Sequence, residues 1–189
     1  MEAATTKFYY AGFWPRVGAL LIDMLIFAPL IILVLWIEKY SRLFAVYWLI
    51  PSALLALWYS VHLVARFGGT PGKLLLKIRI VSVDGLPITW RQAFIRHLPE
   101  FALSILTSAA FCLPLLAMSD SRYAEIISLG ARGQELRAHM PSWYAPVEIA
   151  GQIWTWSEFI VLLTNAKRRA LHDFIAGTVV IRTAPVADA

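Results

Sequence analysis

Four long apolar runs dominate the pattern of hydrophobic and polar positions along this chain. They cover about residues 13–37, 43–64, 101–118 and 147–163. A helix needs about 20 mainly apolar residues to cross a bilayer, and the last two runs are the shorter ones. The pattern predicts a single all-α integral membrane domain over residues 1–189, built as a four-transmembrane-helix bundle.

The connection at residues 65–98 is predicted to carry a small β-element. Polar and apolar residues alternate from Lys77 and continue as strand-prone chain to Val83, and the pair Asp84-Gly85 then signals a tight turn. Residues 86–90 suit a returning strand at a sheet edge, because their proline lacks an N–H donor. Residues 177–181 form another strand-prone run. We therefore expect a small cytoplasmic hairpin or sheet.

Two further segments are predicted to be surface amphipathic helices. Residues 90–98 combine basic and aromatic side chains, a mixture that suits a helix lying at the bilayer surface. In the connection at residues 119–146, apolar residues between Tyr123 and Gly130 recur at helical spacing. This connection is also longer than loops without secondary structure usually are.

Composition and charge support a membrane protein and orient it. Hydrophobic residues make up 59% of the chain and charged residues 15%, more apolar surface than a soluble domain of this length can bury. The net charge is +5, and basic residues gather in the 65–98 connection and after the last run. By the positive-inside rule, both termini and residues 65–98 lie in the cytoplasm and residues 119–146 lie outside. We expect an inner or plasma membrane location and no nucleic-acid partner.

Ionisable residues inside the apolar runs form the candidate site. Arg16 and Asp23 stand seven residues apart, about two helical turns, so they share one face of a helix. Glu158 lies in the last run, while His62 and Glu100 lie at the ends of two others and are accessory candidates. The predicted topology brings all five to the cytoplasmic half of the bundle. Ionisable groups there cost several kcal/mol unless they are paired or hydrated.

Two interpretations of this set stay open. In the first, Asp23 is a carrier carboxylate that exchanges a proton for a cation such as sodium, with Glu158 as its partner and Arg16 tuning their charge. Four helices make a small pathway, so a homo-oligomer is expected in that case. In the second, the charges are ion pairs that fix helix packing, and the protein is a non-catalytic scaffold or assembly factor.

Other motifs give no support for an enzyme, a cofactor or a metal. Residues 68–73 are glycine-rich but lack the first glycine and the Ser or Thr of a phosphate loop, so they predict only a tight turn. His172-Asp173 has metal-ligand chemistry without a surrounding ligand cluster. The basic triplet at residues 167–169 suits a lipid-headgroup anchor. The single Cys112 excludes an intrachain disulfide.

Three blocks of this sequence together resemble the RDD family of multi-pass membrane proteins, named for one arginine and two aspartates. Residues 13–23 are similar to the family's opening, with Arg16 as the arginine and Asp23 as the first aspartate. Residues 69–85 are similar to its loop after the second helix. Residues 168–178 resemble its C-terminal signature, whereas residues 101–146 depart from the pattern.

The resemblance implies a transport or transport-associated function, since some members of the family are linked to sodium–proton exchange. It also makes Asp173 the second aspartate, just past the last apolar run. We expect Asp173 to compete for Arg16 at the cytoplasmic mouth and to tie the tail to the first helix. Whether Arg16 pairs with Asp23 or with Asp173 stays open at this point.

Overall fold

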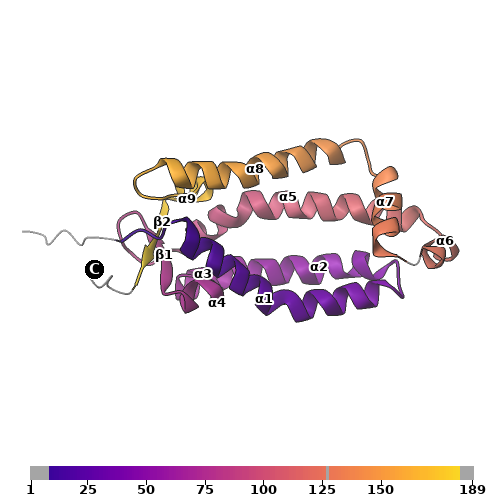
Figure 1. The fold of residues 1–189 in the computed structure, drawn as a ribbon, viewed down its shortest axis with the longest axis horizontal. Helices are drawn as coiled ribbons and strands as arrows, with labels where there is room; N and C mark the ends of the chain where they lie inside the picture. The colour runs from indigo at the N-terminus through magenta and orange to yellow at the C-terminus, as the bar shows by residue number, and fades with distance from the viewer. Residues whose placement is uncertain (1–8, 127, 184–189) are drawn as a thin grey trace, which may run out of the picture. The chain divides into compact units, whose positions relative to one another are not determined.

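The computed structural model describes residues 9–126 and 128–183, which form mainly helices (Figure 1). In chain order the elements are α1 (Phe13–Glu38), α2 (Phe44–Leu57), the π-helical turn η1 (Trp58–His62), α3 (Leu63–Phe67), α4 (Pro71–Leu75), β1 (Ile78–Ser82), α5 (Trp90–Ala117), α6 (Asp120–Glu125), α7 (Leu129–Ala138), α8 (Tyr144–Thr164), α9 (Leu171–Ala176) and β2 (Thr178–Arg182).

The described chain divides into two compact units. The first unit contains residues up to 25, residues 58–97 and residues from 156 onward. The second contains residues 26–57 and 98–155, apart from residue 127. Both carboxylates of the resemblance, Asp23 and Asp173, fall in the first unit.

Three helical stretches among the described residues are long and apolar enough to cross a membrane. They are Phe13–Glu38, Phe44–Leu75 and Trp90–Ala117. The fourth predicted span exists as a 21-residue helix, α8, but it does not belong to this set. The polar side chains of Glu148, Gln152 and Glu158 interrupt its apolar sequence. The membrane-protein class is confirmed, and the fourth crossing is not.

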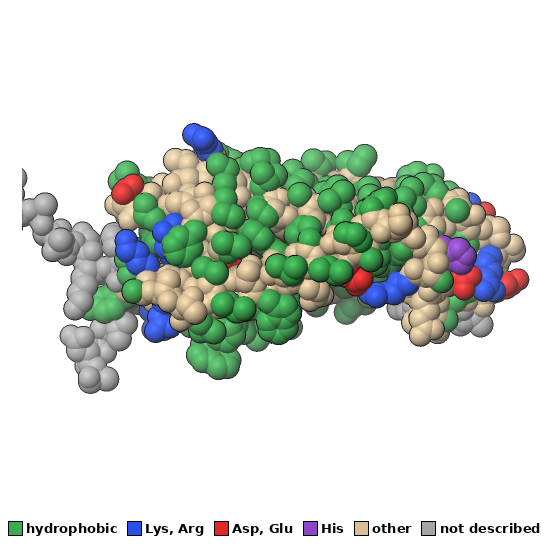
Figure 2. Space-filling model, turned by 90° about the horizontal axis from the view of Figure 1, so that it is seen from above, with side chains coloured by type: hydrophobic (Ala, Val, Ile, Leu, Met, Phe, Trp, Pro, Cys, Tyr) green, Lys and Arg blue, Asp and Glu red, His purple; other side chains and the backbone are tan. Residues whose placement is uncertain are grey.

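Large hydrophobic side chains on these helices are exposed rather than buried. Leu25 and Ile32 on α1 are 72% and 67% exposed, and Ile50 on α2 is 69% exposed. Figure 2 shows hydrophobic side chains spread over much of the visible face. Exposed apolar surface of this extent requires a lipid or protein partner. The helices are therefore suited to a bilayer.

The predicted boundary between a surface helix and the third span is wrong. Residues 90–117 form one continuous helix, α5, with Pro99 and Pro114 inside it. A proline removes one backbone hydrogen bond and bends a helix, but it does not have to end the helix when the flanking turns are packed.

The predicted sheet is confirmed, but its strand pairing differs from the expected hairpin. β1 pairs antiparallel with β2, from Ile78 opposite Arg182 to Ser82 opposite Thr178. The chain at residues 86–90 contributes only a single bridge, between Val81 and Pro87. β2 pairs with β1 in place of residues 86–90, and its side chains Val179 and Val180 are buried, at 2% and 0% exposed.

The N-terminal segment lies along the other edge of β2. Tyr10 bridges Ile181, the Ala11 N–H donates to the Val180 carbonyl at 2.8 Å, and the Arg182 N–H donates to the Tyr9 carbonyl at 2.8 Å. Three segments that are far apart in the sequence therefore share one small sheet.

The connection after α5 contains two short helices instead of one. α6 ends at Glu125 and α7 begins at Leu129, each with a serine N-cap whose hydroxyl accepts a backbone N–H. Ile127, part of the predicted helical pattern, lies outside the described residues. Tyr144, the first residue of α8, is 8% exposed and packs edge-on against Phe111.

The glycine-rich turn joins α3 to α4 and brings α4 very close to α1. Gly68 ends α3 with a left-handed φ of 78°, and Pro71 is the first residue of α4, where its missing N–H costs nothing. A Cβ on Gly72 would come 2.2 Å from the Ala19 carbonyl oxygen. Only glycine fits there, which is a packing reason for this turn and not a phosphate-binding one.

We predict that Gly72→Ala destabilises the protein and that Gly151→Ala does not. Overpacking costs about 1–3 kcal/mol or more when backbone must move, and the obstructing atom here is backbone. Among the described residues nothing lies within 4 Å of a Cβ on Gly151, inside α8, so alanine there should add up to about 1 kcal/mol of helix propensity. Thermal unfolding of the two purified variants in detergent measures the difference. Equal melting temperatures would contradict the close approach.

Candidate functional site: two buried carboxylates

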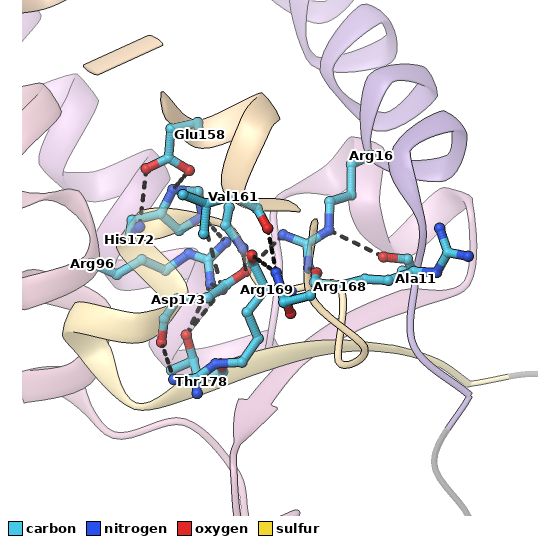
Figure 3. A network of polar contacts seen from close by, with 12 residues as sticks. Ala11, Arg16, Arg96, Glu158, Val161, Arg168, Arg169, His172, Asp173 and Thr178 are labelled. Carbon is cyan, nitrogen blue, oxygen red and sulfur yellow. Dashed lines mark hydrogen bonds and ion pairs between the residues drawn. The ribbon is translucent and has the colours of Figure 1, made fainter. Parts of the chain in front are cut away.

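The carboxylate of Asp173 is the centre of a polar network in the first unit (Figure 3). Its side chain is 0% exposed. Oδ2 accepts from Arg16 Nη1 at 2.7 Å and from the Ala170 N–H at 3.0 Å. Oδ1 accepts from Arg96 Nη1 and from Thr178 Oγ1, the latter at 3.1 Å. The donors come from α1, α5, the start of α9 and β2.

Both arginines are held by further bonds and cannot easily leave Asp173. Arg16 Nε donates to the Ala11 carbonyl at 3.3 Å, and its Nη2 donates to the Arg168 carbonyl at 2.7 Å. Arg96 Nη2 lies 2.5 Å from His172 Nε2. Arg16 therefore joins the start of α1 to the loop before α9 as well as to the aspartate.

Two opposing effects act on the ionisation of Asp173. Burial alone raises the pKa of a carboxyl group. The positive charge of Arg96, and after it that of Arg16, outweighs burial and holds the pKa of Asp173 well below its usual range. Because the pKa of Asp173 is lower in the folded protein than in the unfolded one, its ionised carboxylate adds fully to the free energy of unfolding above the unfolded-state pKa of about 4. That contribution is lost only as the pH falls below this pKa. The network is therefore ionised throughout the physiological range.

His172 is a neutral member of the network. An arginine can only donate, so His172 Nε2 must accept from Arg96 and the ring proton must be on Nδ1, which lies against Glu158 Oε2. The His172 backbone N–H donates to Glu158 Oε1 at 3.0 Å. Burial, together with the charge of Arg96, lowers the pKa of His172. With Nε2 occupied, the pair His172-Asp173 has no geometry for a metal, and the described residues contain no group of three metal-ligand side chains.

One residue of the basic triplet, Arg169, is turned inward, whereas Lys167 and Arg168 are exposed and the prediction of a headgroup anchor remains for them. Arg169 Nε donates to the Thr178 carbonyl at 3.0 Å, and its Nη2 donates to the Asp173 carbonyl at 2.8 Å. Its guanidinium also stacks 4.0 Å over the Phe174 ring. Asn165 clamps the Arg169 backbone through bonds of 2.7 and 2.8 Å. This arginine therefore fixes α9 against β2.

The carboxylate of Asp23 forms a second, separate cluster in the first unit. Asp23 is 9% exposed. Oδ1 accepts from Tyr59 Oη at 2.5 Å and from the Gly72 N–H at 2.7 Å, and Oδ2 accepts from Thr70 Oγ1 at 2.6 Å. Lys73 Nζ donates to Thr70 Oγ1 at 3.4 Å, so the nearest cation reaches Asp23 only through a hydroxyl.

The Asp23 cluster caps helix α4 from outside. Thr70 is the N-cap of α4, but its side chain makes no capping bond and donates to Asp23 instead. Asp23 then takes the free N–H of Gly72 in the first turn, where a negative charge is favourable. Tyr59 reaches the same carboxylate from the π-helical turn η1, a conformation that places side chains off the α-helical register.

The five predicted site residues do not converge on one site. Arg16 pairs with Asp173 and not with Asp23, which resolves the alternative that the sequence left open. Glu158 joins the Asp173 network through His172. His62 packs its ring against Trp58 and Trp90. Glu100 is exposed on α5 and belongs to the second unit.

Sequence reasoning missed the residues that complete both clusters. Arg96 was assigned to a surface helix, although its side chain is only 10% exposed. A basic residue among apolar ones predicts either a snorkelling or a buried arginine, and the pattern alone does not separate the two. Thr70 and Thr178 lie inside the blocks that resemble the family, but nothing in the sequence assigns their hydroxyls a role, and Tyr59 lies outside those blocks.

The two carboxylates differ in what they can still bind. An ionised carboxylate has about four lone-pair sites. Asp173 accepts four hydrogen bonds from the described residues, so it is saturated. Asp23 accepts three from them, two on Oδ1 and one on Oδ2, and the donors on it are neutral.

The long apolar helices, with their exposed hydrophobic side chains, indicate a membrane protein. The family model of the RDD family matches residues 10–177. Because that match covers most of the 189 residues, the chain belongs to the RDD family. No curated protein and no solved structure matches the chain significantly.

We predict that Arg96→Gln destabilises the protein by about 3–5 kcal/mol, because it leaves Asp173 with half of its charge compensation in a fully buried position. Arg91→Gln, on the exposed side of the same helix, is the matched control and should stay within about 0.5 kcal/mol of the parent protein. Chemical denaturation in mild detergent, followed by tryptophan fluorescence, measures both. A small effect at Arg96 would show that the network is not structural.

Proposed function

We propose that this protein is a non-enzymatic membrane scaffold or assembly protein whose signature charges are structural. The observation that carries the proposal is the saturation of Asp173 by four protein donors at 0% exposure. A carboxylate that carries an ion must release protein donors at each cycle, and here those donors come from four different segments. The same contacts suit a structural role, because they hold four segments together. We call Asp173 with Arg16 and Arg96 the clasp.

The proposed topology has four crossings with both termini in the cytoplasm. Residues 9–11, β1 and β2 share one sheet, so these three segments must lie on one side of the bilayer. The stretches Phe13–Glu38 and Phe44–Leu75 return the chain to the side of residue 10, and Trp90–Ala117 takes it away again. Only a crossing by α8 brings β2 back. Its 21 residues span about 31 Å, enough for the hydrocarbon core.

The excess of basic residues on the sheet side supports its proposed location in the cytoplasm, with an inner or plasma membrane as the membrane crossed. We predict that, in a Cys112→Ala background, Asp84→Cys is labelled by a membrane-impermeant maleimide only after permeabilisation, whereas Ser121→Cys is labelled in intact spheroplasts. Both side chains are exposed, in the turn after β1 and on α6 respectively. Labelling of the cysteine at position 84 in intact spheroplasts would mean that the orientation is the reverse of the proposed one. Labelling of both cysteines from the same side would mean that the two positions are not separated by a membrane crossing.

Cation–proton antiport through Asp23 is the second candidate. One observation favours it: Asp23 stands in the first apolar helix with one acceptor site that no described residue fills. Two of its donors are the hydroxyls of Tyr59 and Thr70, which can reverse their bonds when the carboxyl is protonated. A transporter built from four helices would act as a homo-oligomer, with sodium or a proton as its ligand.

A flux measurement separates the two functions. Purified protein is reconstituted into liposomes, a pH gradient is imposed, and sodium flux is recorded for the wild-type chain and for Asp23→Asn. The scaffold predicts that the wild type does not exceed empty liposomes. Sodium flux that depends on pH, and that Asp23→Asn abolishes while the melting temperature is kept, would instead establish the antiporter.

A further inference from the structure

A cavity of about 430 Å³ lies in the second unit, apart from both carboxylate clusters. Its walls come from α1, α2, α5, α6 and α7 and are mainly apolar, with Leu35, Trp48, Leu49 and Phe111 among them. Its volume falls in the range of small-molecule sites, which are apolar clefts with a few placed polar groups.

Arg132 supplies to this cavity a buried charge that forms no direct ion pair with a described carboxylate, although the charge of Glu38 acts on it from the same lining. It is 8% exposed, and its Nε has no hydrogen-bond partner among the described residues. Its remaining bonds reach the backbone carbonyls of Glu38, Lys39 and Tyr123 at 3.3–3.4 Å, the weak end of the range for N–H···O. The guanidinium also lies 4.0 Å over the Tyr123 ring.

A buried guanidinium in this state differs from the other buried arginines of the described chain. Arg16 and Arg96 both pair directly with Asp173, whereas no described carboxylate lies within ion-pair distance of Arg132. Glu38 is not in contact with the guanidinium, so the charge of Arg132 keeps part of the cost of its burial. An anion in the cavity would contact the guanidinium directly and exchange three long bonds to carbonyls for an ion pair.

The apolar walls indicate which kind of anion fits. A small soluble anion would leave them empty, but an acyl chain would cover them. The helices that build the walls carry exposed apolar side chains suited to lipid, so lipid chains have direct access. Glu38 lines the cavity together with Arg132 and offers a carboxylate to an ammonium group on the same ligand.

We propose that this cavity binds one membrane phospholipid, with its phosphate at Arg132 and an acyl chain along the apolar wall. The site is independent of the clasp and of any ion flux. It assigns to the segment after α5 a role in lipid recognition.

Two glycines of α7 provide a matched pair for the test. A Cβ on Gly133 or on Gly130 would meet nothing within 4 Å among the described residues. Gly133 lines the cavity, whereas Gly130 is exposed and is not part of its lining. Gly133→Leu should therefore fill the cavity without a clash, and Gly130→Leu should cause the same change of helix propensity outside it.

The experiment uses the full chain in detergent, stripped of lipid and titrated with phosphatidylethanolamine while bound lipid is counted by native mass spectrometry. We expect one phospholipid per protomer for the wild type and Gly130→Leu, and affinity at least about tenfold weaker for Gly133→Leu. Arg132→Gln should weaken phosphatidylethanolamine about tenfold but leave diacylglycerol, which lacks the phosphate, unchanged.

Several results would overturn the proposal. Equal lipid binding by the two leucine variants would place the lipid elsewhere. Inorganic phosphate alone, or a fatty acid, binding as tightly as the phospholipid would exclude the proposed ligand. If Gly133→Leu failed to fold, the comparison of phosphatidylethanolamine with diacylglycerol on Arg132→Gln would still decide, because equal losses for both lipids contradict a phosphate contact.

Discussion

The buried carboxylate of Asp173 is the contact on which the first unit depends. Its four hydrogen bonds join the start of α1, the N-terminal part of α5, the loop before α9 and the first residue of β2. A charge at this depth is tolerated only because Arg16 and Arg96 neutralise it, and neither arginine is tolerable without the aspartate. Removing any one of these three side chains therefore leaves a buried charge unpaired, which lowers the free energy of unfolding.

The clasp and the sheet constrain the path of the chain through the bilayer. The N-terminal segment, β1 and β2 are joined by backbone hydrogen bonds, and for that reason the proposed topology has an even number of crossings between them. α8 is not among the helices apolar enough to be counted as spans, yet its Glu158 is engaged by His172 at the edge of the same network. A paired glutamate at a helix end is compatible with a span whose remainder is apolar.

The hydrophobic pattern was sufficient to predict the apolar helices, the β-prone runs and the presence of charge in α1. The hydrophobic pattern was not sufficient to predict which charged side chains pair. Such pairs can join residues about 150 positions apart in the sequence, as Arg16 and Asp173 do. The family resemblance supplied that aspartate, whereas Arg96 and the hydroxyls around Asp23 had no distinctive signal. Arg132 is one of several charged residues in the connection after α5, and only its burial in the folded chain makes it a candidate anion site.

A double-mutant cycle on Arg16 and Asp173 tests the structural clasp most directly. The free energies of unfolding of Arg16→Gln, Asp173→Asn and the double variant are compared with that of the parent chain in the same detergent. A structural clasp predicts that the double variant loses much less stability than the sum of the single losses, with a coupling of about 1–3 kcal/mol. Losses that add to within about 0.3 kcal/mol would contradict the account, because the two side chains would then not depend on each other.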